Sequence, residues 1–225
     1  MAAFYAAGAM TLLYRLDAPA RDIAQCFGAR AGEDPWAGGY VSPGQFAPVI
    51  TAGREEIAGL RRERQPRRMI PRLWGVPPLP SMHGAPRGIA NVRNADSPFW
   101  TGNLRNSEFR CLVTATAFME WHKGMDAQGK RIQHWYAPAD QPLFAMAGVW
   151  KDSEIPTFAL LTCEPNAVLR EAGRDAMPVI LPADPKAQDL WLRGDWKRAS
   201  ALLVPYASSM MGELSPTRTD PNFPR

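Results

Sequence analysis

Three polar side chains in the middle of the chain have residue types and spacing suited to chemistry on a sugar-phosphate. Asn91 and Arg93 stand two residues apart just before a Ser-Pro-aromatic turn, and Glu120 is the one carboxylate in the uncharged run after Arg110. If Asn91 and Arg93 lie on a strand, their side chains point the same way. An amide, a guanidinium and a carboxylate can together orient a sugar, hold a phosphate bidentately and move a proton.

The apolar surroundings of Glu120 favour a general acid or base. Desolvation raises the pKa of a carboxylate, and groups shifted in this way gather at catalytic sites. The alternative is a carboxylate at the end of a strand that faces water or pairs with an arginine. For Asn91 and Arg93 the alternative is a structural turn network.

A second group of residues could contact nucleic acid. Arg72 ends the most basic stretch of the chain, which begins at Arg54 and also contains three glutamates. Such a stretch is either a phosphate-binding edge or a solvated face. Trp74, Phe99 and Trp100 could stack on the bases of single-stranded DNA, although aromatic side chains more often belong to the core.

The cysteines and histidines argue against a disulfide framework and a metal site. Cys26, Cys111 and Cys163 are widely spaced and odd in number, which fits a reducing compartment. The three histidines have no metal-ligand spacing, so we expect neither metal nor cofactor. A thiol peptidase built on Cys163 and His122 remains an alternative, although the sequence does not bring the two together.

Composition predicts one α+β domain. The chain has 225 residues, of which 22 are prolines and 18 glycines, a content that favours short strands and many turns. The formal net charge of +4 is compatible with a polyanionic partner without being diagnostic of one. There is no apolar run of about 18 residues, so no membrane span is expected. We expect a cytoplasmic monomer associated with the nucleoid.

Local patterns predict many short elements around a curved, mainly antiparallel sheet. We expect helices over 17–28, from Asp96, over 166–171 and over 185–192. The expected strands cover 47–52, 69–76, 111–116, 118–123, 143–150, 157–162 and 179–181. The expected boundaries are an apolar extension over 1–9, one domain over 10–207, and a Pro-rich tail over 208–225.

Several segments, in order, resemble the SRAP family (SOS response-associated peptidase). They are Met10–Leu16, Tyr40–Ile50, Leu73–Pro77, Ile89–Trp100, Arg110–Trp121, Phe158–Ala167 and Ala176–Leu181. The resemblance implies one compact domain with a β-barrel-like core and a DNA groove on one face. It also implies binding of abasic sites in single-stranded DNA and crosslinking to them, with lyase- or peptidase-like activity. Glu120 and Asn91 would then act in catalysis, and Arg93, Arg72, Trp74, Phe99 and Trp100 would bind DNA.

The chain departs from the family pattern at two positions. Thr11 stands where the family has its reactive Cys, nine residues precede Met10, and Gly173 falls where the family usually has a His. Gly173 offers no proton, and the neighbouring Arg174 or Asp175 could fill the space of that His. A chain trimmed to begin at Thr11 would carry an α-amine able to form a Schiff base with an abasic aldehyde. Otherwise Thr11 merely begins a strand and the chemistry is impaired. A catalytically inactive interaction module on the same fold is the rival interpretation.

Overall fold

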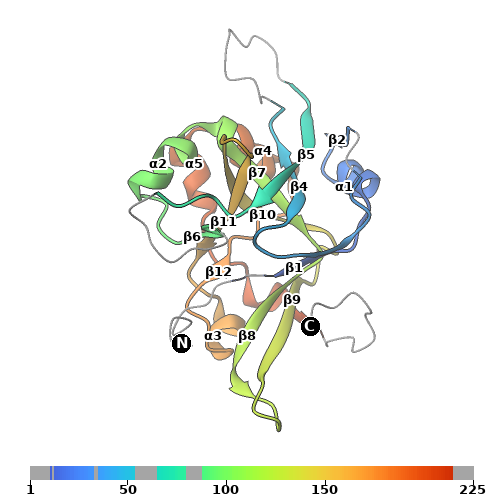
Figure 1. The fold of residues 1–225 in the computed structure, drawn as a ribbon, viewed down its shortest axis with the longest axis vertical. Helices are drawn as coiled ribbons and strands as arrows, with labels where there is room; N and C mark the ends of the chain where they lie inside the picture. The colour runs from blue at the N-terminus through green and yellow to red at the C-terminus, as the bar shows by residue number, and fades with distance from the viewer. Residues whose placement is uncertain (1–10, 12, 33–34, 54–64, 80–87, 215–225) are drawn as a thin grey trace.

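A closed ring of five strands forms the centre of the fold (Figure 1). The computed structural model describes residues 11, 13–32, 35–53, 65–79 and 88–214. The order around the ring is β4 (Phe46–Thr51), β5 (Arg67–Trp74), β11 (Thr157–Cys163), β10 (Phe144–Lys151) and β7 (Arg110–Ala115), which returns to β4. The pairing of β5 with β11 is parallel and the other four are antiparallel. The predicted α+β class with a mainly antiparallel, barrel-like sheet is confirmed.

Except for β5, which carries three arginines, the ring strands have the largely apolar sequences that burial on both faces requires. All six residues of β7 are buried, and β10 is buried from Phe144 to Trp150. Gly148 allows β10 to approach β7 closely, because a Cβ there would lie 2.8 Å from the sulfur of Cys111. The core of the ring is mainly apolar, although Arg110, Thr114 and Thr157 on its strands are also buried.

A second antiparallel sheet carries the N-terminal strand to the site. Its order is β13 (Met211–Leu214), β9 (Arg131–Pro138), β8 (Ala117–Met125), β1 (Tyr14–Leu16) and β3 (Gly39–Val41). Tyr14 pairs with Phe118, so the residues before β1 run beside the first half of β8. The hairpin of β8 and β9 projects beyond the ring in Figure 1, whereas α2, α4 and α5 lie at the opposite end.

Three two-residue strands extend the ring. β2 (Ala29–Arg30) joins β5, while β6 (Asn91–Val92) and β12 (Met177–Pro178) join β11. The strand expected over 179–181 is displaced: the ladder falls on Met177–Pro178, and Ile180 makes a single bridge to Met146. Part of the segment expected to be a tail forms β13, because pairing with β9 satisfies its backbone and buries Met211.

Short helices cover the ring. They are α1 (Ala20–Cys26), α2 (Pro98–Arg105), α3 (Ala167–Glu171), α4 (Pro185–Arg193) and α5 (Trp196–Ala199), with 3-10 turns over Ser107–Phe109, Ser200–Leu202 and Ser208–Met210. Ser97 and Asp184 cap α2 and α4, and each helix has a proline in its first turn. Helix α1 begins later than expected, because Pro19 is extended at ψ 160°.

Candidate functional site

Thr11, Asn91 and Glu120 meet at one buried point, although they are far apart in sequence. The Thr11 hydroxyl donates a hydrogen bond to Oε1 of Glu120. The Asn91 side-chain amide donates to the backbone oxygen of Thr11 at 2.9 Å. The three residues are 1%, 7% and 1% exposed. The pairing of β1 with β8 brings Thr11 to Glu120, and β6 brings Asn91 in from the ring.

Glu120 sits in an environment that suits a group that exchanges protons near neutral pH. Burial raises the pKa of its carboxyl from 4.5 to about 7, against the lowering effects of the Thr11 hydroxyl and Arg174. Nε of Arg174 lies 3.0 Å from Oε2 of Glu120. Glu120 thus has features of both interpretations made from the sequence: it is buried, and it is paired with an arginine. A carboxyl that titrates near pH 7 can both give and take a proton.

Asn91 presents an unused acceptor in the site. Within the described part of the chain, its Oδ1 is buried and has no hydrogen-bond partner. A buried polar atom without a partner is costly, and a catalytic role is one of the explanations for such an atom in a native structure. An amine or a sugar hydroxyl beside Thr11 could supply the missing donor.

Arg174, not Gly173, is the residue that this segment brings to Glu120. Besides its ion pair with Glu120, Nη1 of Arg174 donates to the Trp121 backbone oxygen at 3.4 Å. A Cβ at Gly173 would instead meet Lys123, 2.9 Å from its Cβ, and Gly173 has φ +81°. Gly173 itself brings no side chain to Glu120, and the neighbouring Arg174 fills the space beside the carboxylate.

Replacing Gly173 with histidine should destabilise the fold. The left-handed backbone disfavours a Cβ by about 1–2 kcal/mol, and the contact with Lys123 adds to this cost. Urea denaturation should show the loss. Gly102→Ala in α2 is the matched control, since nothing lies within 4 Å of a Cβ there, and it should be neutral or stabilising. Equal stability of Gly173→His and the parent chain would contradict this assignment.

The stability of the protein should also report the pKa of Glu120. Its folded-state pKa, about 7, exceeds its unfolded value, so the native state holds more protons between pH 4.5 and 7. This contribution is fully present below the unfolded pKa and is lost as the pH rises through the folded pKa. The loss is up to about 3 kcal/mol at roughly 1.4 kcal/mol per pKa unit.

Glu120→Gln should flatten this part of the profile. The free energy of unfolding, measured in urea, should fall between pH 5 and pH 8 by less for Glu120→Gln than for the parent protein. Parallel profiles for parent and variant would show that Glu120 titrates at an ordinary pKa.

Arg93 lies beside this site on the surface. Nη2 of Arg93 contacts Oδ2 of Asp175 at 2.7 Å, and both side chains are about half exposed. The two residues line a cavity of about 610 Å³ together with Thr162, Cys163, Glu164, Ala176, Leu203 and Pro205. The pKa of Asp175 is lowered, chiefly by its hydrogen bond to Arg93. Arg93 is thus placed next to the site, with a carboxylate already bound to it.

Two of the three aromatic residues predicted to stack on bases are buried. Trp74 is fully buried between Tyr14 and Phe158, and its indole N–H donates to the Ala90 oxygen at 2.9 Å. Trp100 is 5% exposed. Neither offers a face to a base, because the closure of the ring and the packing of α2 cover both. The stacking interpretation is therefore retained for Phe99 alone, which is half-buried.

Lys151 and Arg72 each lie over an aromatic ring. Nζ of Lys151 lies 3.6 Å from the centroid of the Phe99 ring, and burial lowers the Lys151 pKa. The guanidinium of Arg72 lies 4.8 Å from the centroid of the Trp150 ring. Trp150 is only 2% exposed, and Lys151 already occupies one face of the Phe99 ring, so the DNA-binding role of Arg72 and Phe99 stays a prediction.

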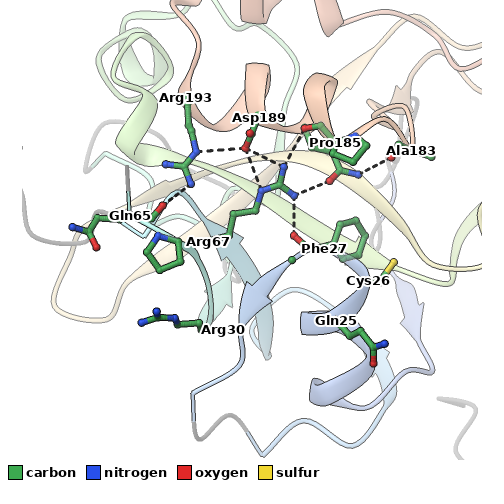
Figure 2. A pocket seen from close by; sticks show the side chains of 13 residues that line it. Gln25, Cys26, Phe27, Arg30, Gln65, Arg67, Ala183, Pro185, Asp189 and Arg193 are labelled. Atoms are coloured by element: carbon green, nitrogen blue, oxygen red, sulfur yellow. Dashed lines mark hydrogen bonds and ion pairs between the residues drawn. The ribbon is translucent and has the colours of Figure 1, made fainter. Parts of the chain in front are cut away.

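The basic stretch divides between described and undescribed residues. Residues 54–64 lie outside the described part of the chain. Arg67 lies in a network with Asp189, Gln188 and the backbone oxygens of Phe27 and Pro185, which Figure 2 shows around a pocket of about 650 Å³. These contacts use all the donors of Arg67 to hold β5 against α1 and α4. Arg67 is thus structural.

The thiol peptidase alternative finds little support in the geometry. Burial raises the pKa of the Cys163 thiol to about 12, so the nucleophilic thiolate is scarce. His122 stacks on His134 at 4.7 Å between ring centroids, and Nδ1 of His134 contacts Glu213 at 2.6 Å. Sequence reasoning missed this histidine pair because it depends on the register of β8 with β9.

No group of three or more metal-binding side chains occurs within the described ranges. In the same part of the chain, no helix is long and apolar enough to span a membrane.

Comparison with known proteins places the fold and the family. The family described as "SOS response associated peptidase (SRAP)" matches residues 10–218. Crystal structures of a protein from Bacteroides thetaiotaomicron and of one from Bordetella bronchiseptica are similar, each with a TM-score of 0.68. Their identities are 20% and 19%; 90% of this chain is covered in both, and 90% and 97% of theirs. A phage-related protein from Bordetella bronchiseptica matches at TM-score 0.64 and 17% identity, covering 90% of this chain and 92% of its own. No curated protein is significantly similar to the chain.

Proposed function

The chain belongs to the SOS response associated peptidase (SRAP) family, and on this premise we propose that it binds abasic sites in single-stranded DNA at Thr11, Asn91 and Glu120. Family membership implies binding of abasic DNA and crosslinking to it. The observation that carries the proposal is the convergence of these three residues at one buried point. Arg93 would hold a flanking phosphate, and Phe99 and Arg72 would contact the strand farther away. We place this activity in the cytoplasm, at the nucleoid, with the protein acting as a monomer.

Residue 11 limits the covalent chemistry of the 225-residue chain. Within a peptide, the nitrogen of Thr11 is an amide and cannot condense with an aldehyde. A chain that begins at Thr11 has an α-amine with an ordinary pKa of about 8, so part of it is neutral at pH 7. That amine can add to the ring-opened aldehyde, and loss of water gives a Schiff base. Glu120 would donate the proton that leaves with the water.

The threonine hydroxyl makes the next step less durable than a thiol would. The thiol of a cysteine closes on the Schiff base to a thiazolidine. The Thr11 hydroxyl would add to the same carbon and pass its proton to Glu120, giving an oxazolidine, which should be hydrolysed more readily. Crosslinking is therefore impaired in this chain while binding is retained.

Equilibrium binding tests the proposal. Fluorescence anisotropy should show that the protein binds a single-stranded oligonucleotide with a tetrahydrofuran abasic site more tightly than the intact strand or the duplex. Binding should weaken with salt, because phosphate contacts release counterions. Asn91→Ala should reduce the preference for the abasic strand. The proposal fails if no oligonucleotide binds at low salt.

The rival function is an interaction module that kept the fold and lost the chemistry. The ion pair between Arg174 and Glu120 favours it, because a guanidinium restrains the carboxylate. In that case the same titrations should show no preference for the abasic strand, and Asn91→Ala should have no effect on them.

A further inference from the structure

Four charged side chains of alternating sign lead from the buried site to the surface. Glu120 is paired with Arg174, and Asp175, the next residue along the chain, is paired with Arg93. The side chains of Glu120 and Arg174 are 2% and 11% exposed, whereas those of Asp175 and Arg93 are 57% and 49% exposed. The outer pair, Asp175 and Arg93, can therefore exchange partners with a ligand. The inner pair, Glu120 and Arg174, is shielded from a ligand.

The cavity at the outer pair has the wrong charge for an anion as it stands. Arg93 is the cation among its lining side chains, and Asp175 and Glu164 are carboxylates. A DNA phosphate that entered would meet two negative charges and a guanidinium already bound to a carboxylate at 2.7 Å. A phosphate can be held here if it takes the place of the Asp175 carboxylate, since both are anions that accept from a guanidinium.

We propose that Asp175 competes with a backbone phosphate of the DNA strand for Arg93, so that a strand enters this cavity by displacing the Asp175 carboxylate. The inference rests on the proposed function. It assigns to Asp175 the role of a residue that sets affinity: it weakens binding to any strand and leaves most of the selection to the abasic contacts at Thr11, Asn91 and Glu120.

Displacement of Asp175 has a consequence for the inner pair. The charge of Arg174 acts on the Asp175 carboxyl, and the charge of Asp175 raises the pKa of Glu120. A carboxylate released from Arg93 has Arg174 as its nearest described cationic neighbour along the chain. Occupancy of Arg93 by phosphate is thus linked to the electrostatics of Glu120.

A double-mutant cycle tests the competition. The probe is a single-stranded oligonucleotide with a tetrahydrofuran abasic site, which cannot form a Schiff base. Asp175→Asn should lower the Kd about three- to fivefold, the scale of an exposed ion pair that no longer has to be broken. Arg93→Gln should raise the Kd and reduce the salt slope by about 0.7, as expected for one phosphate contact on a single strand.

The coupling between the two substitutions distinguishes competition for Arg93 from a general effect of charge. In the Arg93→Gln background, Asp175→Asn should change the Kd by less than about twofold, because there is no guanidinium left to release. Glu171→Gln is the matched control: it removes one exposed carboxylate from the adjacent helix α3, outside the lining of the cavity. Its effect should be small and equal in both backgrounds.

The outcomes separate this inference from the function on which it rests. If the parent protein binds and Asp175→Asn tightens binding equally with and without Arg93, the effect is one of net charge and the competition is refuted. Weaker binding by Asp175→Asn refutes it as well. If neither protein binds any strand, both the inference and the proposed function fail. Thermal unfolding of each variant verifies that these half-exposed substitutions leave the fold intact.

Discussion

A chain that begins at Thr11 and carries Thr11→Cys should form a heat-stable adduct with an abasic single strand, whereas the 225-residue chain should form none. The variant supplies both groups that a durable product needs, an α-amine and a neighbouring thiol. Thr11 already lies against Glu120 and Asn91, so the new side chain is placed without rearrangement. The adduct should be visible as a shifted band on a denaturing gel after heating.

Two controls separate the contributions of the amine and the thiol. A chain that begins at Thr11 with threonine retained should give little band after heating, because its product is hydrolysed. The full-length chain with Thr11→Cys should also give none, because its residue 11 nitrogen remains an amide. A heat-stable band from the unaltered 225-residue chain would refute this account of residue 11.

Glu120→Gln in the crosslinking variant should slow adduct formation by about a hundredfold or more, the usual contribution of a positioned general acid or base. Glutamine keeps a hydrogen-bonding group next to residue 11 but cannot transfer a proton. Initial rates on the denaturing gel give the effect, and Kd values for the tetrahydrofuran strand show whether binding has changed as well. A large loss of rate with little change in Kd identifies Glu120 as catalytic.

The pH dependence of the same reaction supplies a second criterion. The rate of adduct formation by the crosslinking variant that retains Glu120 should show an inflection near pH 7, where the Glu120 carboxyl titrates. The Glu120→Gln variant should lack this inflection. Equal rates in the two proteins would mean that another group moves the proton. The ion pair between Arg174 and Glu120 would then be structural.

The sequence allowed the site to be predicted further than its surroundings. Glu120 stands out as the one carboxylate of an uncharged run and Asn91 as part of an Asn-x-Arg pair, and the resemblance placed Thr11 with them. The sequence indicated Arg174 or Asp175 as the residue that fills the space of the missing His, and the choice between them depends on how the turn between α3 and β12 packs on β8.

The aromatic residues show a second limit of sequence reasoning. Trp74 and Trp100 are of a residue type that can stack on bases. Local sequence does not say which face of a strand or helix is covered by the rest of the fold. That is decided by the long-range pairing of β5 with β11 and by the packing of α2. Element types were predictable from periodicity, proline and capping residues, whereas closure of the ring was implied only by the family resemblance.

Borohydride trapping tests the central claim most directly. A chain that begins at Thr11, incubated with an abasic single strand and reduced, should give a covalent product in which mass spectrometry places the DNA on the Thr11 nitrogen. The 225-residue chain, treated in the same way, should give no product at residue 11. Trapping on a lysine such as Lys123, or no trapping in the shortened chain, would contradict the claim that the abasic sugar binds where Thr11, Asn91 and Glu120 meet.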